Sequence, residues 1–297
     1  MESRPPVEED YDVIVNLLRK IYWEAAARFQ DAHGTPFEIE TWIFENSNNI
    51  GVQTILSGED FVVSYISFEN DPEDQAVLDA LDGNLAPYIQ DAETEALFVN
   101  INANNRSVVR HFHRPEFRKD KWALEFTFAG DDWPRASSHV DLTKKGFRDE
   151  DFNDYLWLLD TAYRPVLLED GLTPDPHRRN VKRAYSVLKS AHESGDFMTY
   201  WKGDSIVGLY LLSENNQLAI AVAPVYQGMG IGTAILSDVL ERMVDEIRYK
   251  QILLYVSETN EIAIGLYVDP WFEKTGSHVD FTYLPSGPEQ PGNFIKT

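Results

Sequence analysis

The chain contains no cysteine, which excludes disulfides, thiolate nucleophiles and zinc sites that cysteines ligate. It also lacks any apolar run of about 18 residues, the length that a membrane-spanning helix needs. Basic residues are scarce, since 26 lysines and arginines face 49 aspartates and glutamates, for a formal net charge of −23. Nucleic acids and anionic membranes attract positively charged surfaces, so we expect neither as a partner. The polar, acidic first residues resemble no secretory signal, and we therefore expect a cytoplasmic location.

Apolar residues make up 43% of the 297 positions, which is enough to build packed cores. At roughly 100–200 residues per domain, this length corresponds to one large domain or two ordinary ones. The segment from Gly130 to His139 is rich in Gly, Asp, Pro and Ser, a composition typical of a linker. We therefore predict two domains, residues 1–136 and residues 137–297.

The second half of the chain has a clear order of expected elements, β-α-α-β-β-β-α-β-α-β. Apolar residues at helical spacing predict helices over residues 149–164, 178–192, 232–247 and 259–267. Short β-rich runs bounded by turn residues predict strands over residues 140–144, 197–202, 205–213, 218–222, 251–256 and 278–284. This order predicts an α/β (α+β) fold in which helices flank a central sheet.

The connection from Pro224 to Thr233 joins an expected strand to an expected helix and contains three glycines, Gly228, Gly230 and Gly232. Glycine lets a backbone approach a ligand closely, and the free N–H groups of a first helical turn attract an anion such as a pyrophosphate. The strict dinucleotide fingerprint G-x-G-x-x-G does not fit, and the Walker A pattern is absent. The alternative is a tight turn in which the glycines serve packing alone.

Two motifs follow each other in this region. The first is Q-x-x-G-x-G, beginning at Gln227, and the second is N-x-x-A-x-x-L-Y, beginning at Asn260 and followed by Trp271-Phe272. Together, in this order and at this spacing, they resemble the GNAT superfamily of acyl-CoA-dependent N-acetyltransferases over about residues 139–285. One position departs from the family pattern, because Trp271 stands where glycine is usual.

The resemblance implies a fold, a co-substrate and a set of site residues. It implies a mixed, mostly antiparallel sheet flanked by helices, and acetyl-CoA as co-substrate without a metal. The pantetheine arm is expected beside Ala221 and Val222, on a strand splayed from its neighbour. Asn260 is expected to bind pantetheine or to cap its helix, and Tyr267 to act as the general acid toward the departing thiolate. The pyrophosphate is expected on the loop formed by Gln227, Gly228, Met229, Gly230, Ile231, Gly232 and Thr233.

The base that deprotonates the amine is less clear from the sequence. Glu214 and Glu258 follow expected strands and are the two candidates, although each also fits a solvated loop carboxylate. His177 and His192 are alternatives, since histidine titrates near neutral pH. A basic cluster on one helical face is open to two interpretations, a site for an anionic acceptor or CoA phosphate and a solvated face; it comprises Arg178, Arg179, Lys182 and Arg183.

The two halves of the chain resemble each other. Residues 96–128, moved forward by 155 positions, align without a gap with residues 251–283, and 6 of the 33 positions are identical. In this alignment Asn105 falls on Asn260, but Phe112 falls on Tyr267, so the hydroxyl is missing. The glycine loop is replaced by a segment with Asp71, Glu73 and Asp74. We therefore predict an internal duplication in which the first, GNAT-like domain has lost acetyl-CoA binding.

The function predicted from these features is transfer of an acetyl group from acetyl-CoA to a primary amine, by direct attack in the second domain. The acceptor is expected to be a small molecule or a peptide, and the protein a monomer or homodimer. Two alternatives remain: a protein that binds acyl-CoA or a partner without catalysis, and, less favoured, a nucleotide-binding oxidoreductase.

Overall fold

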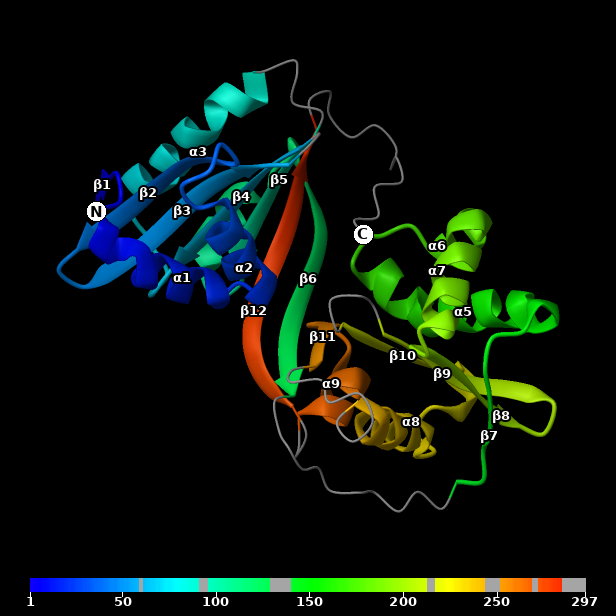
Figure 1. Ribbon diagram of the computed structural model, residues 1–297. Coiled ribbons are helices and arrows are strands. Elements are labelled where there is room, and N and C mark those ends of the chain that lie inside the picture. Colours follow the sequence, from blue (N-terminus) through cyan, green and yellow to red (C-terminus); the bar gives the residue numbers. More distant parts are fainter. Residues whose placement is uncertain are drawn as a thin grey trace. The chain divides into compact units, whose positions relative to one another are not determined.

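The computed structural model describes residues 1–58, 61–90, 96–128, 140–212, 217–243, 252–268 and 272–284 (Figure 1). The described contacts divide the chain into two compact units. Unit 1 comprises Met1–Glu125 with Thr275–Thr297, and unit 2 comprises Phe126–Lys274. The expected boundary after Ala136 lies outside the described residues and stays a prediction. A single cut there would assign the last strand to the second domain, whereas the structure places that strand in unit 1.

Unit 1 is built around one twisted sheet with the strand order β1-β2-β3-β4-β5-β12-β6. The pairing of β4 with β5 is parallel, and β12 pairs antiparallel with β5 from His278↔Asn102 to Thr282↔Phe98. The strands are β1 (Glu2–Arg4), β2 (Glu38–Asn46), β3 (Asn49–Ser57), β4 (Phe61–Phe68), β5 (Ala96–Asn102), β6 (Phe117–Phe128) and β12 (Glu273–Tyr283). The helices are η1 (Glu8–Asp10), α1 (Tyr11–Arg19), α2 (Trp23–Ala32), α3 (Gln75–Gln90) and α4 (Arg106–Phe112).

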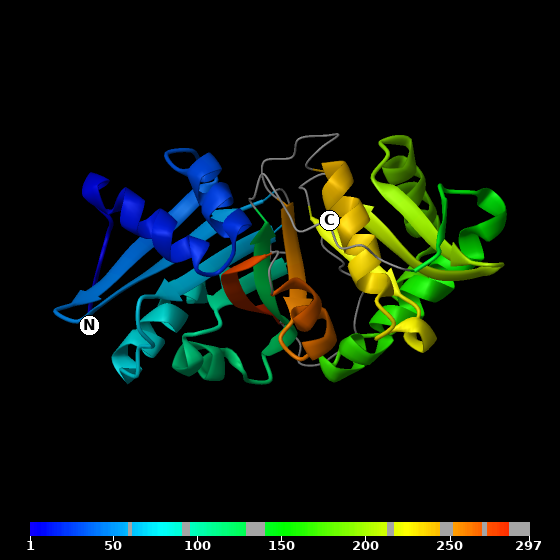
Figure 2. The same cartoon turned by 90° about the horizontal axis from the view of Figure 1, so that it is seen from below.

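The helices of unit 1 cover both faces of its sheet. Figure 2 shows α1 and α2, in blue, on one face and α3 and α4, in cyan and green, on the other. On the α3 and α4 face, Leu81, Val99, Phe112 and Phe281 are fully buried in one apolar cluster. Burying large apolar side chains in this way contributes about 1.5–3 kcal/mol for each one.

Unit 2 has a second sheet, antiparallel throughout, with the order β7-β8-β9-β10. The strands of this sheet are β7 (Thr143–Lys145), β8 (Phe197–Lys202), β9 (Ser205–Leu212) and β10 (Leu218–Val222), and unit 2 also contains β11 (Ile252–Ser257), which is not one of the four. Its helices are η2 (Asp149–Asp151), α5 (Phe152–Glu169), α6 (Pro176–Arg179), α7 (Val181–Glu193), η3 (Pro224–Tyr226), α8 (Ile231–Leu240) and α9 (Glu261–Tyr267). The mixed α/β class is confirmed, and the strands follow one another in the predicted order.

Two helix boundaries differ from the expectation. The helix expected to end at Arg164 continues through Pro165 to Glu169. A proline removes one helical hydrogen bond, but the helix is not obliged to end there when further residues pack. The helix expected over residues 178–192 is two helices, because Asn180 lies between them and its side chain accepts a hydrogen bond from the backbone N–H of Arg183. Within the described residues, no helix has the length and apolarity to span a membrane.

The same order of elements occurs twice along the chain. Each half begins with a short strand and a 3-10 helix, and continues through two helical segments, three antiparallel strands, a helix, a strand, a short helix and a last strand. Helix α9 begins at Glu261, 155 positions after Arg106 begins α4, which is the offset of the sequence repeat. The duplication itself stays a prediction.

Candidate active site

Strands β10 and β11 of unit 2 lie next to each other but separate along their length. Within the described parts of the two strands they share a single parallel bridge, between Gln217 and Leu253. Beyond it, β10 continues to Val222 paired only with β9, and β11 continues to Ser257. In unit 1 the corresponding strands β4 and β5 are paired at six positions. The splayed pair expected from the family resemblance is therefore present in unit 2.

The glycine loop follows β10 and leads into α8. Gly228 and Gly230 have φ angles of 73° and 78°, in the left-handed region that favours glycine, and Gly230 is the N-cap of α8. The first helical hydrogen bond runs from the N–H of Ala234 to the carbonyl of Gly230. The N–H groups of Ile231, Gly232 and Thr233 therefore precede the hydrogen-bond ladder of the helix, at its positive end.

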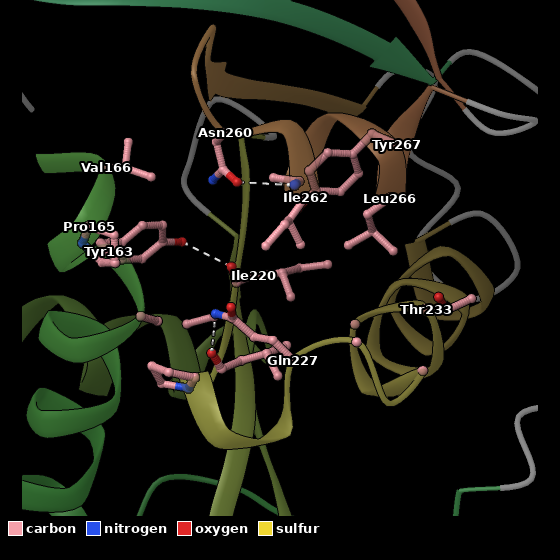
Figure 3. Close-up of a pocket in the computed structure, with 18 residues that line it drawn as sticks. Tyr163, Pro165, Val166, Ile220, Gln227, Thr233, Asn260, Ile262, Leu266 and Tyr267 are labelled. Carbon is pink, nitrogen blue, oxygen red and sulfur yellow. Dashed lines mark hydrogen bonds between the residues drawn. The ribbon is translucent and has the colours of Figure 1, made fainter. Parts of the chain in front are cut away.

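A cavity of about 470 Å³ lies between these elements. Its lining comes from α5 on one side, β10 and the glycine loop on another, and α9 on the third (Figure 3). Ile220, Val166 and Leu266 make much of its wall apolar, while the loop and two tyrosines add polar groups. The predicted site residues among its lining are Ala221, Val222, Gln227, Gly228, Gly230, Gly232, Thr233, Asn260 and Tyr267.

Tyr267 ends α9 and lines the cavity from the side of that helix. Only 6% of its surface is exposed, and its ring packs edge-on against Phe272, with ring centroids 5.7 Å apart. Burial raises the pKa of the Tyr267 phenol well above its ordinary value, and the neighbouring Tyr163 raises it further. The phenol therefore keeps its proton at neutral pH and is available as a hydrogen-bond donor.

Tyr163 is a site residue that the sequence reasoning missed. Its place in the apolar pattern of α5 predicted only that it packs on the helix face, and no motif marks it. In the structure Tyr163 extends from α5 toward β10, and its hydroxyl donates a hydrogen bond to the carbonyl oxygen of Ile220, at 3.1 Å (Figure 3). Burial raises the pKa of Tyr163 to about 12.

Asn260 and Gln227 both have side-chain hydrogen bonds to the backbone near the cavity. Asn260 is the N-cap of α9, and its Oδ1 accepts from the N–H of Ala263 at 3.1 Å. Of the two roles expected for Asn260, helix capping is thus present. Gln227 donates from Nε2 to the carbonyl of Val222 at 3.1 Å, which fixes the loop to the end of β10 (Figure 3).

Other predicted residues lie away from the lining or cannot be placed. Glu214 lies outside the described residues. Glu258 follows β11, is half-buried and is not part of the cavity lining. The exposed Met229 and the buried Ile231 belong to the loop but do not line the cavity, either. His192 packs near the ring of Phe147, at 6.4 Å between centroids.

Part of the basic cluster of α6 and α7 forms ion pairs within unit 2. Arg178 contacts the carboxylates of Asp160 and Asp175 at 2.9 Å each. Asp160 is fully buried and also accepts from the backbone N–H and Nδ1 of His177, at 3.0 and 2.8 Å. These contacts favour a structural role for Arg178 and His177. Among the described residues, no group of three or more His, Asp or Glu side chains is placed to hold a metal ion.

In unit 1 the residues that correspond to the cavity lining form other contacts, although a pocket of about 430 Å³ lies between the start of α3 and α4. Asn105, the counterpart of Asn260, bonds both backbone groups of Phe68 at the end of β4. Phe112, the counterpart of Tyr267, is fully buried and packs edge-on against Phe117. At the start of α3, the Asp74 carboxylate accepts from the N–H of Ala76 at 3.0 Å, so a side-chain anion occupies that helix end.

Comparison with known proteins shows what this chain is similar to. Among solved structures, a GCN5-related N-acetyltransferase from Sphaerobacter thermophilus is similar over 99% of this chain and 97% of that chain, with a TM-score of 0.55 and 16% identity. An acetyltransferase of the GNAT family from Colwellia psychrerythraea is similar over 96% of this chain and 100% of that chain, with a TM-score of 0.48 and 13% identity.

A tandem GNAT protein from the clavulanic acid biosynthesis pathway is similar over 97% of this chain and 99% of that chain, with a TM-score of 0.39 and 13% identity. No curated protein sequence matches the chain. The first of the three structures shares its fold with both units of this chain. The sequence model of the acetyltransferase (GNAT) family matches residues 152–269. Residues 152–269 of unit 2 are therefore similar to the acetyltransferase (GNAT) family.

Proposed function

We propose that unit 2 transfers an acetyl group from acetyl-CoA to a primary amine. One observation carries this proposal: a cavity opens beside the free edge of β10, between α5, the glycine loop and α9, with the start of α8 and the phenol of Tyr267 both in its wall. The helix start suits a polyanion and the phenol suits a leaving thiolate. The family match of residues 152–269 supports the same activity.

The glycine loop is suited to hold the pyrophosphate of acetyl-CoA. The N–H groups of Ile231, Gly232 and Thr233 point out of the helix start, where the helix dipole adds a partial positive charge. Gly228 and Gly230 carry no side chain at the two left-handed positions, so the backbone itself can reach the phosphates. Backbone amides thus supply the attraction in a chain with a formal charge of −23.

The reaction follows from placing the thioester at the inner end of this cavity. The neutral nitrogen of the amine attacks the carbonyl carbon, a C–N bond forms and the C–S bond breaks. The nitrogen loses one proton to a base, and the sulfur leaves as a thiolate that accepts a hydrogen bond or a proton. Both substrates are bound at once, so no acyl-enzyme forms, in keeping with a chain that has no cysteine.

Tyr267 is the residue that we assign to the leaving thiolate. Its phenol is buried, keeps its proton and lies in the cavity wall. A raised pKa makes complete proton transfer from the phenol harder, so its main contribution is a hydrogen bond to the sulfur as negative charge develops there. The desolvated thiolate has a raised proton affinity as well, which favours the transfer once the bond has broken.

The proton acceptor for the amine stays a prediction. Most alkylamines are protonated at neutral pH, so a base acting directly or through water is required. Glu214 and Glu258 remain the candidates, and Glu258 is joined to the cavity wall through the short turn that leads to Asn260.

For unit 1 we propose that no acetyl-CoA is bound. Its paired strands β4 and β5, the bond of Asn105 to Phe68 and the carboxylate of Asp74 at the start of α3 support this. A carboxylate at that position repels a phosphate, because like charges at close range disfavour each other.

The test combines a binding measurement with an activity measurement. Acetyl-CoA is titrated into the purified protein by calorimetry, and a panel of amines is then screened for release of free CoA thiol. Binding with release in the presence of some amines supports the proposal. Binding without release from any amine favours a protein that binds acyl-CoA without catalysis, and absence of binding contradicts both.

A further inference from the structure

The open edge of β10 carries the backbone groups of Ile220 and Val222. In the antiparallel pair of β9 and β10, residues that bond across the pair alternate with residues that do not. The N–H of Ala223 donates to the carbonyl of Val207 at 3.0 Å, so Ala221 also faces β9, while Ile220 and Val222 face away from it. Their N–H and carbonyl groups therefore point toward the space between β10 and β11.

Both carbonyls on this edge already accept hydrogen bonds from side chains. Tyr163 Oη donates to the carbonyl of Ile220, and Gln227 Nε2 donates to the carbonyl of Val222, each at 3.1 Å. The two donors come from different elements, α5 and the glycine loop, and approach the same edge of one strand (Figure 3). An exposed strand edge normally offers donors and acceptors alternately, so this edge is altered by its side-chain partners.

We propose that Tyr163 is a positioning residue that, together with Gln227, turns the open edge of β10 into a row of hydrogen-bond donors. With one lone pair of each carbonyl engaged, the N–H groups of Ile220 and Val222 become the main groups that the edge offers to a ligand. They lie about 7 Å apart, because two strand residues span about 3.4 Å each. The edge therefore selects a ligand with two acceptor groups at that spacing, and a chain with two amide carbonyls, such as pantetheine, meets this requirement.

Tyr163 also has a second effect on the same edge. A strand edge with free carbonyls tends to pair with its neighbour, and here the neighbour is β11. Because the hydroxyl of Tyr163 already donates to the carbonyl of Ile220, that carbonyl has less to gain from closing on β11, which favours separation of the two strands beyond Gln217. This inference rests on the proposed function, since it assigns the edge to the co-substrate of that reaction.

Tyr163→Phe removes the hydroxyl and leaves the ring that lines the cavity. We expect the affinity for CoA to fall roughly 3- to 10-fold, because the hydrogen bond from Tyr163 to the carbonyl of Ile220 is lost. Affinity for 3′-phosphoadenosine 5′-diphosphate, which is CoA without its pantetheine arm, should not change, because that fragment lies on the glycine loop alone. In turnover, the KM for acetyl-CoA should rise while kcat changes little.

A matched control is Tyr185→Phe on α7, which removes a hydroxyl that donates to Asp149 at 2.7 Å. This variant should bind both probes as the wild type does. Equal affinity of Tyr163→Phe and wild type for CoA would overturn the inference, and so would tighter binding, since the hydroxyl would then compete with the ligand. Loss of affinity for both probes would also overturn it, as a general defect. If the wild type binds neither probe, the proposed function itself fails.

Discussion

Asn105 forms hydrogen bonds with both backbone groups of Phe68, accepting from its N–H at 2.9 Å and donating to its carbonyl at 3.2 Å. Both residues are almost completely buried. In this way an asparagine at the start of α4 closes the end of β4. Its counterpart Asn260 bonds within its own helix start instead and leaves β10 open. The same residue type at the same position of the repeat thus accompanies a closed strand edge in one unit and an open one in the other.

Asn105→Ala should destabilise unit 1, because it leaves a buried N–H and a buried carbonyl of Phe68 without partners. The expected loss is about 2–4 kcal/mol in the free energy of unfolding, measured by chemical denaturation. Asn260→Ala, the control at the matching position, should cost about 1 kcal/mol, the usual cost of removing a helix cap. Equal losses in the two variants would contradict the different roles of these residues.

Tyr267→Phe should lower kcat about 100-fold and leave the affinity for acetyl-CoA close to that of the wild type. The hydroxyl is needed when charge develops on the sulfur, whereas the ring keeps its packing against Phe272. Steady-state rates of CoA release and calorimetric titrations measure the two quantities separately. An unchanged kcat would remove Tyr267 from the chemistry.

Gly230→Ala should weaken acetyl-CoA binding roughly tenfold or more. A Cβ at this position meets only Val140, at 3.9 Å, so the protein itself has space for it. The costs are a left-handed φ of 78°, about 1–2 kcal/mol for a residue other than glycine, and a methyl group where the loop faces phosphate. Gly265→Ala in α9, where an added Cβ meets no atom within 4 Å, serves as the control and should bind normally. Normal binding by Gly230→Ala would argue against a pyrophosphate on this loop.

Asp160→Asn should destabilise unit 2 by about 3 kcal/mol at pH 7, because it breaks a buried network with His177 and Arg178. Burial acts to raise the pKa of Asp160, but the hydrogen bonds from His177 and Arg178 outweigh it, and the pKa lies below its ordinary value. The stabilisation that the Asp160 carboxylate provides is therefore fully present above about pH 4, which is the pKa of an aspartate in the unfolded chain. It is lost as the pH falls through the lower pKa that Asp160 has in the folded protein.

The difference in unfolding free energy between wild type and Asp160→Asn, measured from pH 7 down to pH 3, checks this pH dependence. It should be constant above about pH 5 and shrink below pH 4. A difference that grows as the pH falls would have the wrong sign for a depressed pKa.

The sequence predicted the fold of unit 2 and most of its cavity because the informative residues are local. Glycines at positive φ and an asparagine at a helix start follow from backbone geometry that a short segment decides, and both were recognisable. Tyr163 was not, because its role depends on an approach of α5 to β10 across 57 positions of the chain. Periodicity marks such a residue as one that packs, without saying which backbone group it reaches.

The same reason explains the assignment of the last strand. The repeat correctly aligns β12 with β6, but an alignment does not say which sheet a strand joins. The partner of His278 is Asn102, and this pairing is decided by the fit of side chains between distant segments. The sequence likewise predicted a helix end at Arg164, whereas α5 continues through Pro165 to Glu169.

The position of β12 has a consequence for how the protein is made. Its residues 275–283 are added to the chain after all of unit 2, yet they lie in the sheet of unit 1 beside β5. During synthesis, residues 1–125 of unit 1 therefore leave the ribosome before β12, and the edge of β5 that pairs with β12 stays unpaired until β12 has been made. Unit 2 has its complete sheet available sooner, although it is encoded later. Released chains that end at residue 274 should accordingly show a protease-sensitive first unit and a protected second one.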